Sequence, residues 1–133
     1  MAPNLVAVLE TSLYVADLER SISFYRDVLG LRLISEFENR RGAAFRIGES
    51  IQLLFDPAQT AGPDDLPSHT GSGEGHVAFR VTAQELARWR AHLQAKGVAI
   101  EKEFSFGSQP PSIYFCDPDY NLLEFAVPQI GPR

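Results

Sequence analysis

Two stretches of this chain repeat the same order of structural signals, and this internal repeat constrains the fold more than any other feature. Residues 7–15 and 76–81 each carry apolar residues on at least one alternating face, which predicts a β-strand. A segment with helical spacing follows each strand and ends at a glycine, Gly30 in the first half and Gly97 in the second. Because repeated sequence corresponds to repeated structure, we expect two similar modules.

Both expected helices begin at a residue suited to cap the first turn. Asp17 precedes the first apolar stripe, and Thr82 precedes the second with Glu85 three residues later, as in a capping box. Three short β-like runs follow each terminal glycine. They are 31–37, 43–47 and 50–55 in the first half, and 98–104, 112–116 and 122–127 in the second. Each half is therefore predicted to have the order β-α-β-β-β.

The size of the chain suits one domain made from both halves. It has 133 residues, of which 44% are hydrophobic and 22% charged. We predict a single domain over 1–133, with module 1 at about 5–56, a linker at 57–74 and module 2 at about 75–128. Repeated Pro and Gly residues argue against regular structure in the linker, which is interpreted as a plain connection or as a lid over a site.

Charge and cysteine content argue against several classes of partner. The formal net charge of −5 lacks the positive excess that binding to nucleic acid draws on. No run approaches the roughly 18 apolar residues of a membrane span, and the first residues lack the pattern of a secretory signal. The single cysteine, Cys116, forms no intrachain disulfide and is expected to be buried and unreactive. We expect a cytoplasmic protein that acts on a small molecule, without nucleic acid or membrane.

Four polar residues interrupt the apolar pattern at matching places in the two halves. Glu10 and His76 stand in the first strand of each half, and Gln52 and Glu124 stand in the last. Two carboxylates, an amide oxygen and an imidazole are together typical of a divalent-cation site. Each residue alone also suits an ordinary position in a sheet, so the metal hypothesis depends on the symmetry of the four positions.

These residues lie within longer motifs that resemble a known family. ETSLYVADLERS and FYRDVLGL in the first half, with GHVAFRV and YFCDPDYNLLEF in the second, look like the vicinal oxygen chelate superfamily. That superfamily contains glyoxalase I, extradiol dioxygenases, methylmalonyl-CoA epimerase, and the fosfomycin- and bleomycin-resistance proteins. The resemblance implies an α+β fold of two βαβββ modules that form a curved mixed sheet, with helices outside and a metal on the inner face. It places the four ligand positions on Glu10, Gln52, His76 and Glu124, with Glu10 where the family usually has His or Gln.

The resemblance also bears on the reaction. A ligand set with one histidine favours glyoxalase or epimerase chemistry over extradiol cleavage or fosfomycin thiol transfer, which favour two histidines. In that chemistry a metal binds vicinal oxygens of a small substrate, a proton moves through an enediolate, and Glu10 and Glu124 are the candidate catalytic carboxylates. The oxygen-rich set suits Mn²⁺, Ni²⁺, Co²⁺, Fe²⁺ or Mg²⁺, and Zn²⁺ stays open.

Three alternatives remain open at this point. The first is a ligand- or drug-sequestering protein of the bleomycin-resistance type, which contains no metal. The second is an extradiol dioxygenase-like oxidoreductase, and the third is a degenerate member with a purely structural role.

Further residues are candidates for substrate binding. Strand alternation turns Tyr14, Arg80 and Tyr114 to the side of the proposed metal, and His69 lies in the linker, although each also suits an ordinary surface position. The turn at 117–121 lacks the family's usual glycine, which predicts that Asn121 takes a positive φ. The resemblance further implies a homodimer, with modules that sometimes exchange between chains.

Overall fold

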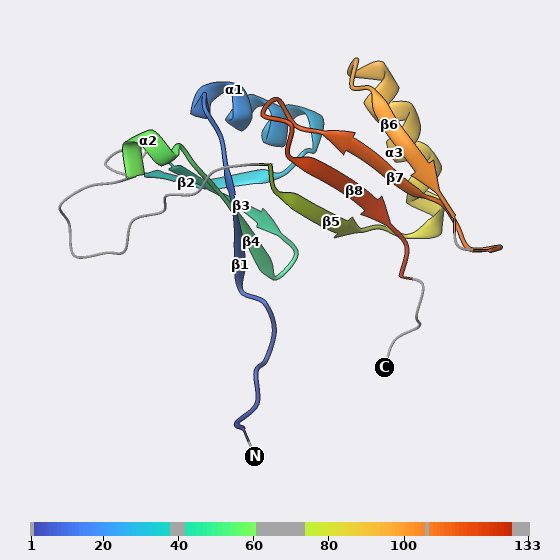
Figure 1. Cartoon of the computed structure of the whole chain (residues 1–133), viewed down its shortest axis with the longest axis horizontal. Coiled ribbons are helices and arrows are strands. Elements are labelled where there is room, and N and C mark those ends of the chain that lie inside the picture. The colour runs from blue at the N-terminus through green and yellow to red at the C-terminus, as the bar shows by residue number, and fades with distance from the viewer. Residues whose placement is uncertain (1, 38–41, 61–73, 106, 129–133) are drawn as a thin grey trace. The chain divides into compact units, whose positions relative to one another are not determined.

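Each β-α-β-β-β repeat forms its own compact unit. The computed structural model describes residues 2–37, 42–60, 74–105 and 107–128 of the chain (Figure 1). Unit 1 comprises Met1–Gly73 and unit 2 comprises Glu74–Arg133. The predicted α+β class with paired βαβββ modules is confirmed, because each unit contains a four-stranded mixed sheet with the same strand order.

Unit 1 is built on the sheet order β1-β4-β3-β2. Its strands are β1 (Glu10–Tyr14), β2 (Arg32–Phe37), β3 (Gly42–Ile47) and β4 (Ser50–Phe55). β1 pairs with β4 in parallel, and the other pairs are antiparallel. β1 starts later than the predicted strand, since residues 7–9 lie outside it. A short helix α2 (Pro57–Thr60) follows β4, where the sequence predicted no regular structure.

The helical segment of unit 1 covers one face of this sheet. α1 (Leu18–Ser23) starts where the Asp17 carboxylate accepts a hydrogen bond from the amide of Arg20 at 3.1 Å, as the sequence predicts. It continues into the π-helical turn η1 (Phe24–Val28), a wider turn that the sequence did not predict. The buried ring of Tyr25 in η1 lies 5.8 Å from the ring of Phe45 on β3. The sheet face that carries Phe45 is therefore the helix face of unit 1.

Unit 2 repeats this arrangement with the sheet order β5-β8-β7-β6. Its elements are β5 (His76–Arg80), α3 (Ala83–Ala95), β6 (Ile100–Phe104), β7 (Ser112–Cys116) and β8 (Leu122–Ala126). Thr82 caps α3 by accepting a hydrogen bond from the amide of Glu85 at 3.2 Å, as predicted. The rings of Trp89 on α3 and Phe125 on β8 lie 4.6 Å apart, so the face with Phe125 is the helix face of unit 2. In each unit, the face opposite the helix face is called the distal face.

The turn between β7 and β8 is held by a buried carboxylate. Asp117 accepts hydrogen bonds from the amides of Asp119 and Asn121, at 2.9 and 3.0 Å, and from the side-chain amide of Asn121 at 2.9 Å. The prediction of a positive φ at Asn121 is wrong, because Tyr120 takes that conformation, with φ 64°. The Asn121 side chain instead bridges Asp117 and the amide of Gly75, which donates to it at 2.7 Å.

No helix in the described part of the chain has the length and apolar character needed to cross a membrane.

Candidate metal site

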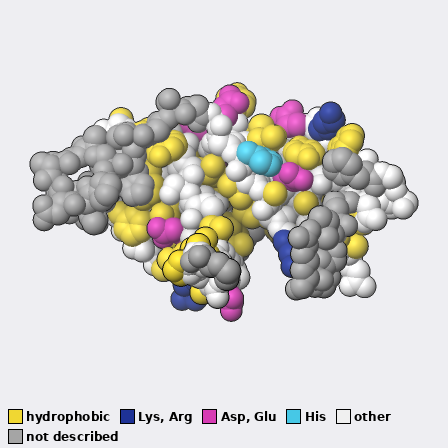
Figure 2. Space-filling view, turned by 60° about the horizontal axis from the view of Figure 1, so that its bottom comes forward, with side chains coloured by type: hydrophobic (Ala, Val, Ile, Leu, Met, Phe, Trp, Pro, Cys, Tyr) yellow, Lys and Arg dark blue, Asp and Glu magenta, His cyan; other side chains and the backbone are white. Residues whose placement is uncertain are grey.

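Unit 2 brings His76 and Glu124 together on its distal face. The parallel register places His76 opposite Leu122 and Ala78 opposite Glu124, so all four side chains point to the same side of the sheet. Nε2 of His76 lies 3.3 Å from Oε1 of Glu124. The imidazole is half exposed and the carboxylate only 13% exposed. The surface in Figure 2 shows a histidine beside an acidic side chain, with hydrophobic side chains around them.

A backbone hydrogen bond sets the orientation of the His76 ring. Nδ1 lies 3.0 Å from the carbonyl oxygen of Leu122. Because a carbonyl only accepts, Nδ1 carries the proton of this bond. Nε2 is then the ring nitrogen that faces the Glu124 carboxylate. A histidine with one nitrogen tied to a backbone carbonyl and the other directed at a carboxylate fits a metal-ligating role.

Tyr114 adds a third group to this pair. It stands opposite Glu124 in the antiparallel pairing of β7 with β8, and the two side chains are hydrogen bonded. Burial first, and then the negative charge and hydrogen bond of Glu124, raise the pKa of Tyr114 above its ordinary value of 10. The phenol therefore stays protonated at neutral pH and donates to the carboxylate.

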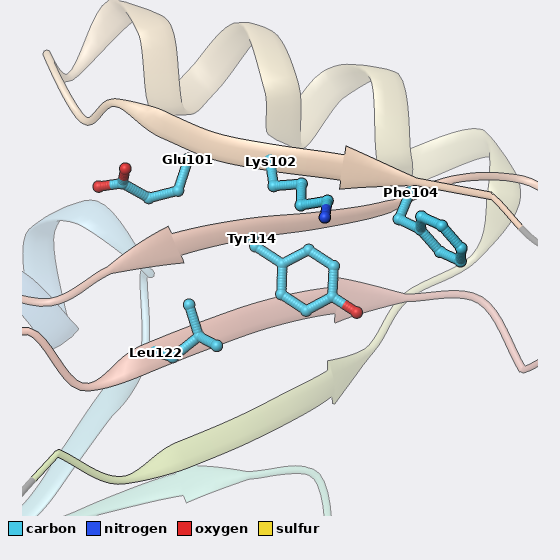
Figure 3. A pocket seen from close by; sticks show the side chains of 5 residues that line it. All are labelled: Glu101, Lys102, Phe104, Tyr114 and Leu122. Atoms are coloured by element: carbon cyan, nitrogen blue, oxygen red, sulfur yellow. The ribbon is translucent and has the colours of Figure 1, made fainter.

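A pocket of about 470 Å³ opens on the same face, next to these residues (Figure 3). Its lining consists of Glu101, Lys102, Phe104, Tyr114 and Leu122. Lys102 stands opposite Tyr114 in the pairing of β6 with β7, and its Nζ lies 5.9 Å from the centroid of the Phe104 ring. In the close-up, the Tyr114 ring lies between the side chains of Lys102 and Leu122. One cation beside two aromatic rings suits an anionic or aromatic ligand.

Sequence analysis missed Lys102 and Phe104 because of an irregularity in β6. The pairing with β7 shifts between Ile100 and Lys102. Ile100 stands opposite Phe115, which is buried on the helix face, whereas Lys102 stands opposite Tyr114 on the distal face. Strict alternation would have put Ile100 and Lys102 on one face, and no local signal in the sequence locates such a bulge.

In unit 1, Glu10 begins β1 as an exposed residue on the distal face. It stands opposite Ile51 of β4, and Ile51 stands opposite Arg46 of β3. The neighbouring position along β4, Gln52, stands opposite Phe45, which belongs to the helix face. Glu10 and Gln52 therefore point to opposite sides of the sheet.

This placement of Gln52 differs from the sequence prediction, which grouped it with Glu10 as a ligand. Gln52 is 1% exposed. Its Oε1 accepts from the Thr11 hydroxyl at 3.0 Å, and its Nε2 donates to the carbonyls of Thr11 at 3.3 Å and Leu53 at 3.1 Å. The side chain thus satisfies its hydrogen bonds inside unit 1, as a buried amide must. The polar side chain of Gln52 within an apolar run was interpreted as a metal ligand, whereas in the structure it makes hydrogen bonds inside unit 1.

The remaining candidates occupy varied positions. Tyr14 lies on the distal face of unit 1, half-buried against a cluster that contains Leu53 and Phe55. Arg80 is exposed at the end of β5, on the same face as His76. His69 lies outside the described residues.

Cys116 is half-buried rather than fully buried. Burial first, and then the negative charges of Glu101, Asp117 and Glu74, raise the pKa of its thiol. This agrees with the expectation of an unreactive cysteine.

Across residues 2–37, 42–60, 74–105 and 107–128, no three His, Cys, Asp or Glu side chains gather closely enough to hold a metal ion. Within unit 2, His76 and Glu124 form a pair of candidate ligands rather than a group of three. Their geometry supplies one imidazole nitrogen and one carboxylate, a donor set that first-row divalent metals accept.

Residues 7–125 match the family described as the Glyoxalase/Bleomycin resistance protein/Dioxygenase superfamily. The chain belongs to this superfamily. The match extends from the segment before β1 to Phe125 in β8, so it includes Glu10, His76 and Glu124. The superfamily membership that the motifs implied is therefore confirmed.

Individual superfamily members show what the chain is similar to. Glutathione transferase FosA of Serratia marcescens is 31% identical over 123 residues, which cover 92% of this chain and 81% of that protein. The crystal structure of lactoylglutathione lyase from Agrobacterium tumefaciens is 30% identical, with a TM-score of 0.85 and coverage of 92% of this chain and 94% of that one.

A third member is known with a metal. A mutant of the fosfomycin resistance protein FosX of Listeria monocytogenes was crystallised with Mn(II) and 1S,2S-dihydroxypropylphosphonic acid. It is 22% identical, with a TM-score of 0.70 and coverage of 98% of this chain and 95% of that one, so this likeness bears on the fold alone.

Proposed function

We propose that the protein is a metal-dependent enzyme of the glyoxalase or epimerase type, which binds two neighbouring oxygens of a small substrate and moves a proton on the adjacent carbon. The observation that carries the proposal is the His76–Glu124 pair. Nδ1 of the imidazole is tied to the Leu122 carbonyl, and Nε2 lies 3.3 Å from the carboxylate. The superfamily membership and the similarity to a lactoylglutathione lyase structure support this assignment.

We propose Nε2 of His76 and the carboxylates of Glu124 and Glu10 as the metal ligands. Glu10 is the first residue of β1, as His76 is of β5, and each stands opposite a residue near the start of the parallel partner strand. This oxygen-rich set suits Mn²⁺, Ni²⁺, Co²⁺, Fe²⁺, Mg²⁺ or Zn²⁺. Such an ion, when bound, supplies Lewis-acid polarisation of the substrate oxygens.

Glu124 is the proposed proton carrier, with Glu10 as the second catalytic carboxylate. Glu124 is largely buried beside the pocket, and Tyr114 donates a hydrogen bond to it. That hydrogen bond directs the carboxylate and limits its motion, which is what a group that removes and returns a proton requires. A substrate in the pocket lies next to this carboxylate, because Tyr114 contacts both.

Lys102 is the proposed contact for a negatively charged group of the substrate. Its ammonium group lines the pocket together with Phe104 and Tyr114. An adduct of a 2-oxoaldehyde with an anionic thiol such as glutathione combines two neighbouring oxygens with carboxylates, and so matches both parts of the site. We also propose that Arg80 and Tyr14 contact substrate from the distal faces of their units.

Sequestration of a ligand without turnover is the second candidate function. The observation in its favour is the pocket itself, whose Phe104 and Tyr114 rings suit an aromatic or drug-like ligand. Metal content separates the two functions, because a sequestering protein of this type contains no stoichiometric metal. A dioxygenase-like reaction is less well supported, since the proposed set has one histidine where non-haem iron oxygenases use two.

The test begins with chelator-treated protein. Mn²⁺ binding is measured by electron paramagnetic resonance for the unaltered protein, His76→Gln and Glu124→Gln, with His92→Gln on α3 as the matched control. We expect stoichiometric Mn²⁺ binding in the unaltered protein and in His92→Gln, and a loss of at least about tenfold in affinity in the other two variants. Metal-dependent turnover is then screened with 2-oxoaldehyde–thiol adducts, acyl-CoA thioesters and catechols. The absence of stoichiometric metal, together with ligand binding that is insensitive to chelator, would establish sequestration instead.

We further propose that the protein is a cytoplasmic homodimer. Its single cysteine suits a reducing compartment, and short superfamily members commonly pair. Light scattering coupled to gel filtration measures the oligomeric state directly.

A further inference from the structure

Two arginines stand side by side on the distal face of unit 1. Arg32 of β2 and Arg46 of β3 are directly opposite each other in the antiparallel pairing, and both are exposed. Arg46 follows Phe45 of the helix face, so both arginine side chains point to the distal side. The Cβ atoms of residues paired in this way lie about 5 Å apart. We propose that Arg32 and Arg46 together bind the phosphate group of a small phosphate monoester.

No side chain in the described part of the chain neutralises this pair of charges. The guanidinium groups of Arg32 and Arg46 make no ion pair or hydrogen bond there, whereas Arg26, Arg88 and Arg90 each contact a carboxylate. The chain has 17 acidic residues against 12 Lys and Arg, so acidic residues are not scarce. Like charges directly opposite each other destabilise a sheet. The pair therefore lowers the stability of unit 1 unless an anion binds between the two groups.

Protection of the sheet edge does not account for both arginines. A charged residue on an edge strand hinders pairing with another sheet, and β2 is at the edge of its sheet. This explains Arg32. It does not explain Arg46, because β3 is an internal strand with neighbours on both sides.

The internal repeat shows that the module folds without a positive charge at the position of Arg46. Ile51 and Leu122 are equivalent, because each stands opposite the first residue of the parallel partner strand, β1 or β5. Arg46 stands opposite Ile51, and Cys116 stands opposite Leu122. The equivalent of Arg46 in unit 2 is thus a half-buried thiol. The arginine pair is consequently a feature of unit 1 and not a requirement of the βαβββ fold.

Two adjacent guanidinium groups favour a phosphate monoester over a carboxylate. Each guanidinium is a planar fork that donates two parallel N–H bonds to an oxyanion. A phosphate monoester has three terminal oxygens and nearly two negative charges at neutral pH, so it accepts bonds from both forks and balances both charges. A carboxylate has two oxygens and one charge. The half-buried Ile51 beside Arg46 gives the organic part of the ester an apolar contact on the same face.

The acidic residues around the pair leave the phosphate position open. Glu10 lies on the far side of Ile51, two strands from Arg46, or about 10 Å at the usual strand spacing. Glu49 lies in the turn after β3 and forms no ion pair with Arg46 among the described residues. The proposed site belongs to unit 1 alone and uses none of the proposed metal ligands, so it can fail or hold independently of the proposed function.

The test is a calorimetric titration with phenyl phosphate at low ionic strength. Chelator-treated protein is used, so that phosphate does not bind to a metal. The variants are Arg32→Gln and Arg46→Gln, with Arg88→Gln on α3 as the matched control, since Arg88 is also exposed. We expect saturable binding of one phenyl phosphate by the unaltered protein and by Arg88→Gln. The other two variants should lose at least about tenfold in affinity, and Arg46→Lys, which keeps the charge without the fork, should lose less.

Melting temperatures provide a second measurement that does not depend on the titration. Without ligand, Arg32→Gln and Arg46→Gln should melt about 1 to 3 °C higher than the unaltered protein, because one of two opposed like charges is gone. Phenyl phosphate should raise the melting temperature of the unaltered protein and of Arg88→Gln only. A lower melting temperature of ligand-free Arg46→Gln would contradict the premise that the pair is unneutralised.

Three results of the titration would overturn the proposal. The first is no saturable binding of phenyl phosphate by the unaltered protein. The second is equal affinity in Arg46→Gln and Arg88→Gln, which would place the bound phosphate elsewhere. The third is binding of benzoate or inorganic phosphate as tight as that of phenyl phosphate, since benzoate has a single charge and inorganic phosphate has no apolar group to contact Ile51.

Discussion

Nε2 of His76 faces Oε1 of Glu124 at 3.3 Å, while the other ring nitrogen lies 3.0 Å from the carbonyl of Leu122, two residues before that same glutamate. One strand, β8, therefore supplies both the carboxylate and the backbone group that orients the imidazole. Substitutions that disturb β8 or its neighbour β7 should therefore act on the site as a whole.

Replacement of Tyr114 by Phe removes the donor to Glu124 and leaves the ring in place. We expect Mn²⁺ affinity to fall by about tenfold, because partners that orient a ligand affect metal binding to that extent. Calorimetric titration measures the change. Tyr120→Phe is the matched control, since Tyr120 is 69% exposed at the turn. An affinity equal to that of the control would show that the phenol does not position the carboxylate.

Replacement of Lys102 by Gln should weaken binding of anionic substrates. Loss of a charge-assisted hydrogen bond corresponds to about 2 kcal/mol, or roughly thirtyfold in KM. The melting temperature should stay almost unchanged, because Lys102 is exposed. The control is Lys96→Gln at the C-cap of α3. If KM for an anionic substrate is the same in both variants, the pocket does not bind the charged group.

Replacement of Tyr120 by Gly should stabilise the protein. Tyr120 has φ 64°, a conformation that costs a side-chain-bearing residue about 1 kcal/mol relative to glycine. Because its side chain is 69% exposed, little packing is lost. We expect the melting temperature to rise by about 3 °C. Tyr120→Ala keeps the strain and should show no rise, so equal stabilisation by both substitutions would contradict this explanation.

Alkylation of Cys116 should be slow at neutral and mildly alkaline pH. Burial and three nearby carboxylates raise the pKa of the thiol, so the reactive thiolate is rarer than in an ordinary cysteine at the same pH. We expect the rate with iodoacetamide to keep increasing above pH 9, the usual thiol value. The protein unfolded in urea is the control and should reach its plateau at lower pH. A plateau at the same pH in both states would exclude the shift.

Much of the fold follows from local signals. Asp17 and Thr82 cap their helices as expected, because capping depends on a few neighbouring atoms. Alternation also placed His76 and Glu124 on one face correctly, since β5 and β8 pair without irregularity. In both cases, the sequence signal lies within a short stretch of chain, a helix start or a single strand.

The faces of Gln52 and Lys102 depend on contacts between distant residues. The side of β4 that faces the helical segment is determined by η1, where Tyr25 packs on Phe45, and Thr11 then satisfies the buried amide of Gln52. The face of Lys102 follows from a shift in pairing between β6 and β7. Neither depends on residue types near the position itself, so alternation alone is insufficient. The position of the positive φ, at Tyr120 rather than at Asn121, also depends on a distant residue, because Asn121 is held by both Asp117 and Gly75.

The bond from the amide of Gly75 to the side chain of Asn121 has a wider consequence. It joins the start of β5 to the turn that precedes β8. The His76 imidazole and the Glu124 carboxylate are therefore held in one hydrogen-bonded frame. The two unit 2 groups that we propose as metal ligands are consequently positioned within unit 2 alone. Selection for a new substrate can then alter Lys102, Phe104 or Tyr114 in the pocket while this hydrogen-bonded frame stays constant.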